Sequence, residues 1–397
     1  MKNPSELFRR RGKNKALKSV PPINKINTKL VASLFLVAIL SIVYTWAFIG
    51  LFETGKSGDS GITGTLIPDK FLYRYYFENP DYSTLLGPGI KNSIAPALLW
   101  KILDGNWYLA SIFNVGMLFF SVLFINKIGN HIGIPISNKL LFFLVLLPET
   151  FIYTVGVLKE IPTLFLFSAL SFYFLKKRWF PFFFCLVLLA LFRYQFFMVI
   201  ALFLVGHVFF QKRNIRFLVL IFVILSSLYP LLAQLETGLS VQEGILYKVD
   251  KPGTGVGALI QSVQTEWYGL STLATMVKIF QILVPWPFPR FPEGSDVDVL
   301  TLVWSISSLM LIPVWIKYFR FLFYALRYPN SIKQDEGIIL SVSFVFIMMI
   351  GLSGFIQHRY LYPALGLILL VAYIPIASRL KGASIPNLPN PVNSRET

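Results

Sequence analysis

Residues 160–210 read EIPTLFLFSALSFYFLKKRWFPFFFCLVLLALFRYQFFMVIALFLVGHVFF, three long apolar stretches separated by very few polar residues. The charged side chains in this segment are confined to Glu160, Lys176–Arg178 and Arg193. A helix that crosses a bilayer needs about 20 consecutive and mainly apolar residues. The segment therefore predicts membrane helices joined by short turns, and much of the remaining chain repeats the pattern.

The composition extends this prediction to the whole chain. Of its 397 residues, 55% are hydrophobic and 14% are charged, whereas a soluble domain carries roughly 25% charged residues. We predict an all-α, polytopic membrane protein with about ten transmembrane helices and two long extracytoplasmic loops. The shortest candidates flank Arg193 and are expected to form a tight hairpin. The candidate spans are 30–52, 107–126, 140–158, 161–176, 179–192, 196–210, 217–235, 299–316, 337–356 and 360–378.

The charge distribution sets the expected topology. With the N-terminus inside, the inner segments hold 24 of the 36 Lys and Arg residues but only four of the 19 acids. Positive residues concentrate on the cytoplasmic side, where anionic headgroups attract them. The net charge of +17 therefore predicts lipid contact rather than nucleic-acid binding. In the cell (inner) membrane, we expect cytoplasmic tails at 1–29 and 381–397, and a transmembrane domain at 30–380 with outer loops 53–106 and 236–298.

The long outer loops are the expected place for chemistry, because sites usually lie on loops held by a rigid scaffold. In the first loop, Asp69 and Tyr73 are four residues apart and can share one face of a short helix. A carboxylate beside aromatic residues can act as general base for a hydroxyl group, although a solvated loop acid has the same pattern and Asp59 is a rival. In the second loop, residues 269–283 predict an amphipathic helix at the outer interface.

Several ionisable residues are expected at membrane depth, where charge is costly and often functional. Lys159 and Glu160 follow the third span, with Glu149 some residues before them. Lys159 can equally extend to the interface, and the two residues can simply mark a turn. Arg193 needs an anionic partner: either a lipid phosphate, which Arg binds through two hydrogen bonds, or a structural pair with Glu149 or Glu160.

Two further outer segments carry candidate binding residues. Trp286 and Arg290 lie in the proline-rich sequence VPWPFPRFPEGSD, which predicts either a wall for a sugar or prenyl chain or an interfacial aromatic belt. His358 and Arg359 lie between the last two spans, where Arg359 can hold a lipid phosphate or extend to the headgroups. The three histidines match no metal-ligand spacing, and the lone Cys185 excludes a Cys-based site. No cofactor is evident, and a divalent-cation requirement stays open.

The order of these segments resembles a known family. Asp69 to Tyr73 forms D-x-x-x-Y, and the sequence from Pro96 to Leu103 reads P-x-L-L-x-x-I-L. They are followed by LPETFIYTVGVLKEIPTLFLFSALSFYFLKKR, LFRYQFF, VPWPFPRF and HRYLYPALG. This order resembles the multi-span glycosyltransferases of the GT-C superfamily, in particular bacterial relatives of the protein mannosyltransferases, over most of residues 30–380.

The resemblance implies a transferase that uses a polyprenyl-phosphate-linked sugar outside the cytoplasm, with membrane lipids, this donor and a glycan or lipid acceptor as partners. Asp69 would be the catalytic residue. The implied substrate-binding residues are Tyr73, Lys159, Glu160, Arg193, Trp286, Arg290, His358 and Arg359, with Lys159, Arg193 and Arg359 facing the donor phosphate. The chain departs from the family because Asp59 and Asp69 are too far apart to form its acidic pair, and we expect no soluble C-terminal domain.

Two other functions fit the same sequence. An O-antigen or exopolysaccharide polymerase or ligase also has long outer loops, and its chemistry would depend on arginines and His358 rather than on Asp69. A transporter or flippase for a lipid-linked saccharide would show internal repeats and broken helices near the midplane. The sequence contains no convincing repeat, which disfavours the transporter.

Overall fold

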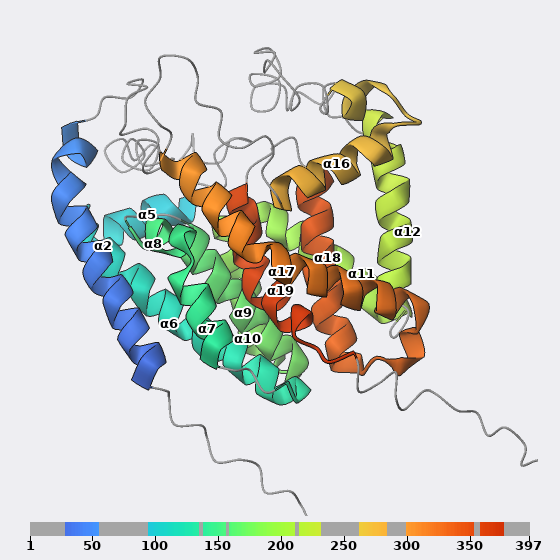
Figure 1. Ribbon diagram of the computed structural model, residues 1–397, viewed down its shortest axis with the longest axis horizontal. Coiled ribbons are helices and arrows are strands. Elements are labelled where there is room, and N and C mark those ends of the chain that lie inside the picture. Colours follow the sequence, from blue (N-terminus) through green and yellow to red (C-terminus); the bar gives the residue numbers. More distant parts are fainter. Residues whose placement is uncertain are drawn as a thin grey trace, which may run out of the picture.

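The computed structural model describes residues 28–54, 94–134, 138–155, 159–210, 214–231, 262–283, 299–352 and 358–376. Within these ranges every regular element is a helix, as the sequence predicts (Figure 1). The α-helices are α2 (Thr28–Thr54), α5 (Ile94–Ile102), α6 (Trp107–Ile132), α7 (Asn138–Leu146), α8 (Pro148–Thr154), α9 (Glu160–Leu175), α10 (Trp179–Phe192), α11 (Tyr194–Phe210), α12 (Asn214–Ser227), α16 (Ser271–Leu283), α17 (Val299–Arg327), α18 (Gln334–Leu352) and α19 (Leu365–Ala372), and the 3-10 helices are η4 (Pro329–Ser331) and η5 (His358–Ala364).

Three of the described helices are long and apolar enough to cross a membrane: α6, the Ser305–Arg327 part of α17, and α18. They occupy different positions in the assembly, because 78% of the apolar window of α18 is buried inside the protein but only 39% of that of α6. A helix that is apolar and buried on every side belongs to the interior. Helix α18 is therefore central and α6 peripheral, and the other apolar helices among the described residues are shorter.

The prediction of one uninterrupted helix over 140–158 is wrong. The helix breaks at Leu147, whose backbone is extended (φ −57°, ψ 131°), and the chain restarts as the short helix α8 at Pro148. Proline lacks an N–H and clashes with a helical residue before it, so the chain before a proline favours an extended conformation. The break places Glu149 in the first turn of a new helix.

Other helix ends also differ from the predicted spans. Helix α6 runs to Ile132 rather than residue 126, because Gly133 (φ 75°) provides the left-handed residue that ends it; at the other end, the Asn106 side chain caps its N-terminus. Helix α17 continues past residue 316 to Arg327. The last predicted span starts as η5, which contains Pro363, and its α-helical part is only Leu365–Ala372.

Hydroxyl groups join α2 to α6 and α8. The hydroxyl groups of Ser41 and Thr154 lie 2.6 Å apart, and those of Thr45 and Ser111 lie 3.2 Å apart. All four side chains are buried. Small polar residues let helices approach closely and hydrogen-bond across an apolar interface. The remaining face of α2 is apolar and exposed, for example at Phe35 and Trp46.

The helix ends that flank the two predicted outer loops lie at one end of the assembly. In Figure 1 the C-terminal end of α2, helix α5, helix α16 and the start of α17 are all in the upper part, while the start of α2 is at the lower edge. Helix α16 confirms the predicted helix within 269–283. Its small and polar residues, including Thr275 and Lys278, face the protein, whereas Leu273 and Phe280 are exposed.

Candidate functional site

Two charged residues of the candidate site lie at the start of α9. Lys159 is the N-cap residue and Glu160 begins the helix. The Thr163 hydroxyl lies within hydrogen-bonding distance of the carbonyl oxygens of both residues, at 2.7 and 2.9 Å. A carboxylate in the first turn is stabilised by the helix dipole. The sequence therefore places a negative charge at a helix end that favours it.

Arg193 lies at the break between α10 and α11. Its backbone is extended (φ −154°, ψ 97°), so α10 ends before it and α11 begins after it. The N–H of Arg193 donates to Leu189 O, and its carbonyl oxygen accepts from the N–H of Phe196. Both backbone groups are thereby satisfied, and the two helices pack against each other as the predicted hairpin.

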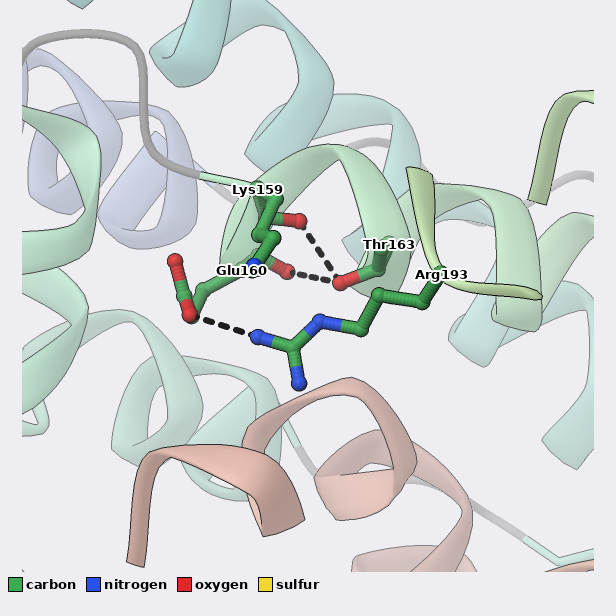
Figure 2. A network of polar contacts seen from close by, with 4 residues as sticks. All are labelled: Lys159, Glu160, Thr163 and Arg193. Carbon is green, nitrogen blue, oxygen red and sulfur yellow. Dashed lines mark hydrogen bonds and ion pairs between the residues drawn. The ribbon is translucent and has the colours of Figure 1, made fainter. Parts of the chain in front are cut away.

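This backbone directs the Arg193 guanidinium toward Glu160, as Figure 2 shows. Arg193 Nη2 donates to Glu160 Oε1 over 2.7 Å, and the two side chains are only 3% and 1% exposed. Burying two charges is expensive and requires good geometry between them. The sequence allowed either Glu149 or Glu160 as the structural partner of Arg193. Among the described residues, Arg193 forms its ion pair with Glu160.

An aromatic ring from η5 covers the guanidinium. The Arg193 Cζ atom lies 4.7 Å from the ring centroid of Tyr360 and 5.6 Å from that of Phe196. A cation over an aromatic face is stabilised by the ring's electron density, especially away from water. Tyr360 belongs to the same 3-10 helix as His358 and Arg359, so η5 contributes to the Arg193 site through Tyr360.

A second group of buried polar residues lies around Glu149, which is 1% exposed. The backbone N–H of Glu149 donates to Ser307 Oγ over 3.2 Å. The Tyr362 hydroxyl donates to Thr150 Oγ1 over 2.8 Å. Hydrogen bonds thus join α8 to α17 and to η5, and η5 also contacts Arg193, the partner of Glu160, through Tyr360, so these residues form one cluster.

The Arg193–Glu160 pair leaves part of its bonding capacity unused. Arg193 Nε and Glu160 Oε2 are buried and have no hydrogen-bond partner among the described residues. A guanidinium and a carboxylate often pair through two parallel hydrogen bonds, but here Arg193 Nη2 alone donates to the Glu160 carboxylate. The guanidinium can therefore accept a further anionic ligand without giving up Glu160.

The structure places three of the predicted site residues together: Lys159, Glu160 and Arg193 are all buried in this cluster. The backbone of His358 and Arg359 begins η5, but their side chains lie outside the description. Asp69, Tyr73, Trp286 and Arg290 also lie outside the described residues.

Sequence reasoning did not single out Thr150, Tyr360 or Tyr362. The available signals were the position of Thr150 beside an acid in an apolar span, and the two tyrosines that alternate in HRYLYP. In the described ranges, no group of three or more His, Cys, Asp or Glu side chains is placed to hold a metal ion.

No protein-family model matches this chain, no curated protein matches it in sequence, and no solved structure matches it in fold.

Proposed function

We propose that the protein is a multi-pass membrane glycosyltransferase that moves a sugar from a polyprenyl-phosphate-linked donor to an acceptor on the outer side of the cell membrane, in cell-envelope glycan synthesis. The observation that carries the proposal is the buried Arg193 guanidinium, which pairs with Glu160 through one N–H group and whose Nε has no hydrogen-bond partner among the described residues. Ionisable groups at membrane depth are costly and usually functional. A phosphate is the anion that a guanidinium recognises best.

The apolar surface and the charge distribution support the membrane setting. Helices α10 and α11 expose Phe180, Phe184 and Phe209, and large exposed apolar patches indicate contact with lipid or another protein. The cationic site follows α8, which lies in the upper part of Figure 1 with α5 and α16. In the proposed topology this end of the assembly faces outward, and both chain termini are cytoplasmic.

The proposed reaction uses one general base and several cations. Asp69 takes the proton of the acceptor hydroxyl as the hydroxyl oxygen bonds to the anomeric carbon of the sugar. The bond between that carbon and the phosphate oxygen breaks, and its electron pair leaves with the polyprenyl phosphate. Arg193, Lys159 and Arg359 stabilise the charge on the departing phosphate. Tyr73, Glu160, Trp286, Arg290 and His358 contact the sugar and its carrier.

The decisive experiment replaces Asp69 in the full chain. Membranes containing Asp69→Asn should insert the protein normally but transfer no sugar from a defined prenyl-phosphate donor. Asp104→Asn is a matched control, because Asp104 is exposed in the α5–α6 turn and asparagine tolerates its positive φ of 52°. Full activity of Asp69→Asn would refute the assignment of the base.

An O-antigen or exopolysaccharide polymerase or ligase is the second candidate function. It is favoured by the contact between Arg193 and Tyr360, because η5 also begins with His358 and Arg359. In such an enzyme Arg359→Ala and His358→Ala would abolish the reaction while Asp69→Asn would not. The two sets of variants therefore distinguish the two enzymes in the same membranes.

A further inference from the structure

A small pocket lies at the opposite end of α18 from helix α16. It is formed by the end of α11, the start of α12, η4 and the first turns of α18, with Asn214, Lys333 and Ser341 among its polar lining residues. Helix α18 has 19 residues, so at ~1.5 Å per residue its two ends are ~27 Å apart. Gly351, near its far end, accepts a hydrogen bond from Gln264, which precedes α16. The pocket is therefore separate from the end of α18 that contacts the α16 region.

The Asn214 side chain is the unusual feature of this pocket. It is 3% exposed, yet neither its Oδ1 nor its Nδ2 has a hydrogen-bond partner in the part of the chain that the structure describes. A buried amide that loses its bonds to water without replacing them is strongly disfavoured. Such a group in a pocket wall indicates a ligand that supplies both a donor and an acceptor.

The neighbouring helix makes room for this amide. A Cβ atom added to Gly206 on α11 would collide with Asn214 Oδ1 and approach Phe217 Cδ1 at 3.3 Å. The glycine thus allows the amide to lie directly against the α11 backbone. This close approach holds the amide in a fixed position at the pocket, which is what a binding site requires.

The size and polarity of the pocket restrict the ligand. Its volume is about 20 Å³, which is room for a water-sized polar group but not for a sugar ring. Ser341, a further hydrogen-bonding group, is 1% exposed. The Lys333 side chain lies in the exposed rim, while the Lys333 backbone N–H is already bonded to Glu336 Oε2. The pocket therefore fits a small uncharged or cationic donor, with an anion outside it near Lys333.

The surface beside the pocket is apolar. His207 lines the pocket from α11, and the next two residues, Val208 and Phe209, are 68% and 74% exposed. A ligand with hydrocarbon chains could lie along this surface while its polar end enters the pocket. Arg216 cannot serve as a second cation for it, because its guanidinium donates to the carbonyl oxygens of Leu326 and Arg327.

We propose that this pocket binds the terminal ammonium or hydroxyl group of a glycerophospholipid headgroup that carries a hydrogen-bond donor near its phosphate, namely an ethanolamine or glycerol headgroup. The donor hydrogen-bonds Asn214 Oδ1, a headgroup oxygen accepts from Asn214 Nδ2, and the phosphate lies beside Lys333. The acyl chains lie along α11. Lipid binding at this pocket does not depend on sugar transfer, and in the proposed topology the pocket faces the cytoplasmic leaflet.

The test is lipid competition on the purified full-length protein. Delipidated protein in detergent is mixed with phosphatidylethanolamine, phosphatidylglycerol and phosphatidylcholine of identical acyl chains, and the bound lipids are counted by native mass spectrometry. The wild type should prefer the first two lipids, because the choline headgroup has no N–H or O–H donor. Asn214→Ala should lose this preference by about tenfold, and Lys333→Gln, an exposed change that leaves folding intact, should weaken phosphatidylglycerol binding.

The matched control is Asn130→Ala, an exposed asparagine near the end of α6, which should keep the wild-type preference. Equal binding of phosphatidylcholine to the wild type overturns the proposal. So does an unchanged preference in Asn214→Ala together with unchanged phosphatidylglycerol binding in Lys333→Gln. If soluble glycerol 3-phosphate competes as well as the lipids do, the acyl chains contribute nothing and the lipid assignment is wrong.

Discussion

Removing the Glu160 carboxylate should destabilise the protein far more than removing a surface carboxylate. In Glu160→Ala, the Arg193 guanidinium keeps its charge but loses the oxygen that lies 2.7 Å away, at a position only 3% exposed. Breaking a buried ion pair by removing one partner costs about 3–5 kcal/mol. The Tyr360 ring does not offset this loss, because its contact with the guanidinium, worth about 0.5–2 kcal/mol, is already present in the wild type.

The assay is thermal unfolding of the protein in lipid nanodiscs, followed by tryptophan fluorescence. Asp335→Asn serves as the control, because the contact of Asp335 Oδ2 with His131 Nε2 is longer, at 3.5 Å, and both side chains are partly exposed. Such a pair contributes about 0–1 kcal/mol. A loss of less than about 1 kcal/mol in Glu160→Ala would mean that Arg193 is not paired with Glu160 in the folded protein.

The double variant Glu160→Leu with Arg193→Met separates stability from function. Replacing a buried pair by apolar residues of similar volume is often neutral or stabilising by about 1–4 kcal/mol. We therefore expect wild-type stability to return. If Arg193 binds the donor phosphate, sugar transfer stays lost in the stable double variant. Recovery of transfer together with stability would show that the pair is structural only.

Three further predictions follow from other parts of the chain. Gly366→Val should destabilise the protein by about 1–3 kcal/mol in denaturant titrations, because a Cβ atom there would press on the Ile125 side chain, whose Cγ1 would be 2.8 Å away. Burial lowers the pKa of Lys278 from 10.5 to about 7. Between pH 7 and 10.5 the unfolded chain therefore binds more protons than the folded one, and the free energy of unfolding should rise with pH over this range. Lys278→Met should show no such rise. A cysteine at Asp81, in a chain whose buried Cys185 is replaced by alanine, should react with an impermeant thiol reagent added outside intact cells, and protection there with reaction in inverted vesicles would reverse the proposed topology.

The sequence predicted the limits of a helix well where one local feature, such as flanking charges, was dominant. The predicted span 179–192 has the same limits as α10, because Lys176–Arg178 before it and Arg193 after it are the nearest charges in an apolar segment. The helix within 269–283 was also recognisable, because its apolar and polar residues fall on opposite faces of a helix. The break at Leu147 was missed because hydropathy passes smoothly through Pro148, although the proline itself carried the signal.

The candidate site could be predicted only in part. Ionisable residues in apolar segments pointed to Lys159, Glu160 and Arg193, and the sequence allowed either Glu149 or Glu160 as a partner of Arg193. Choosing between the two acids requires the position of the α10–α11 break relative to the first turn of α9. That position depends on how whole helices pack, which no local pattern encodes.

Local sequence patterns were enough to establish that the chain forms apolar helices, roughly where these helices lie along the chain, and which charged residues lie among them. It could do so because these properties depend on neighbours within a few turns of the same helix. Helix packing established that Arg193 bonds to Glu160, that Tyr360 from η5 covers the guanidinium, and that Gly206 makes room for the Asn214 amide, which has no hydrogen-bond partner among the described residues. These contacts join residues of different helices, so they follow from the register in which the helices pack.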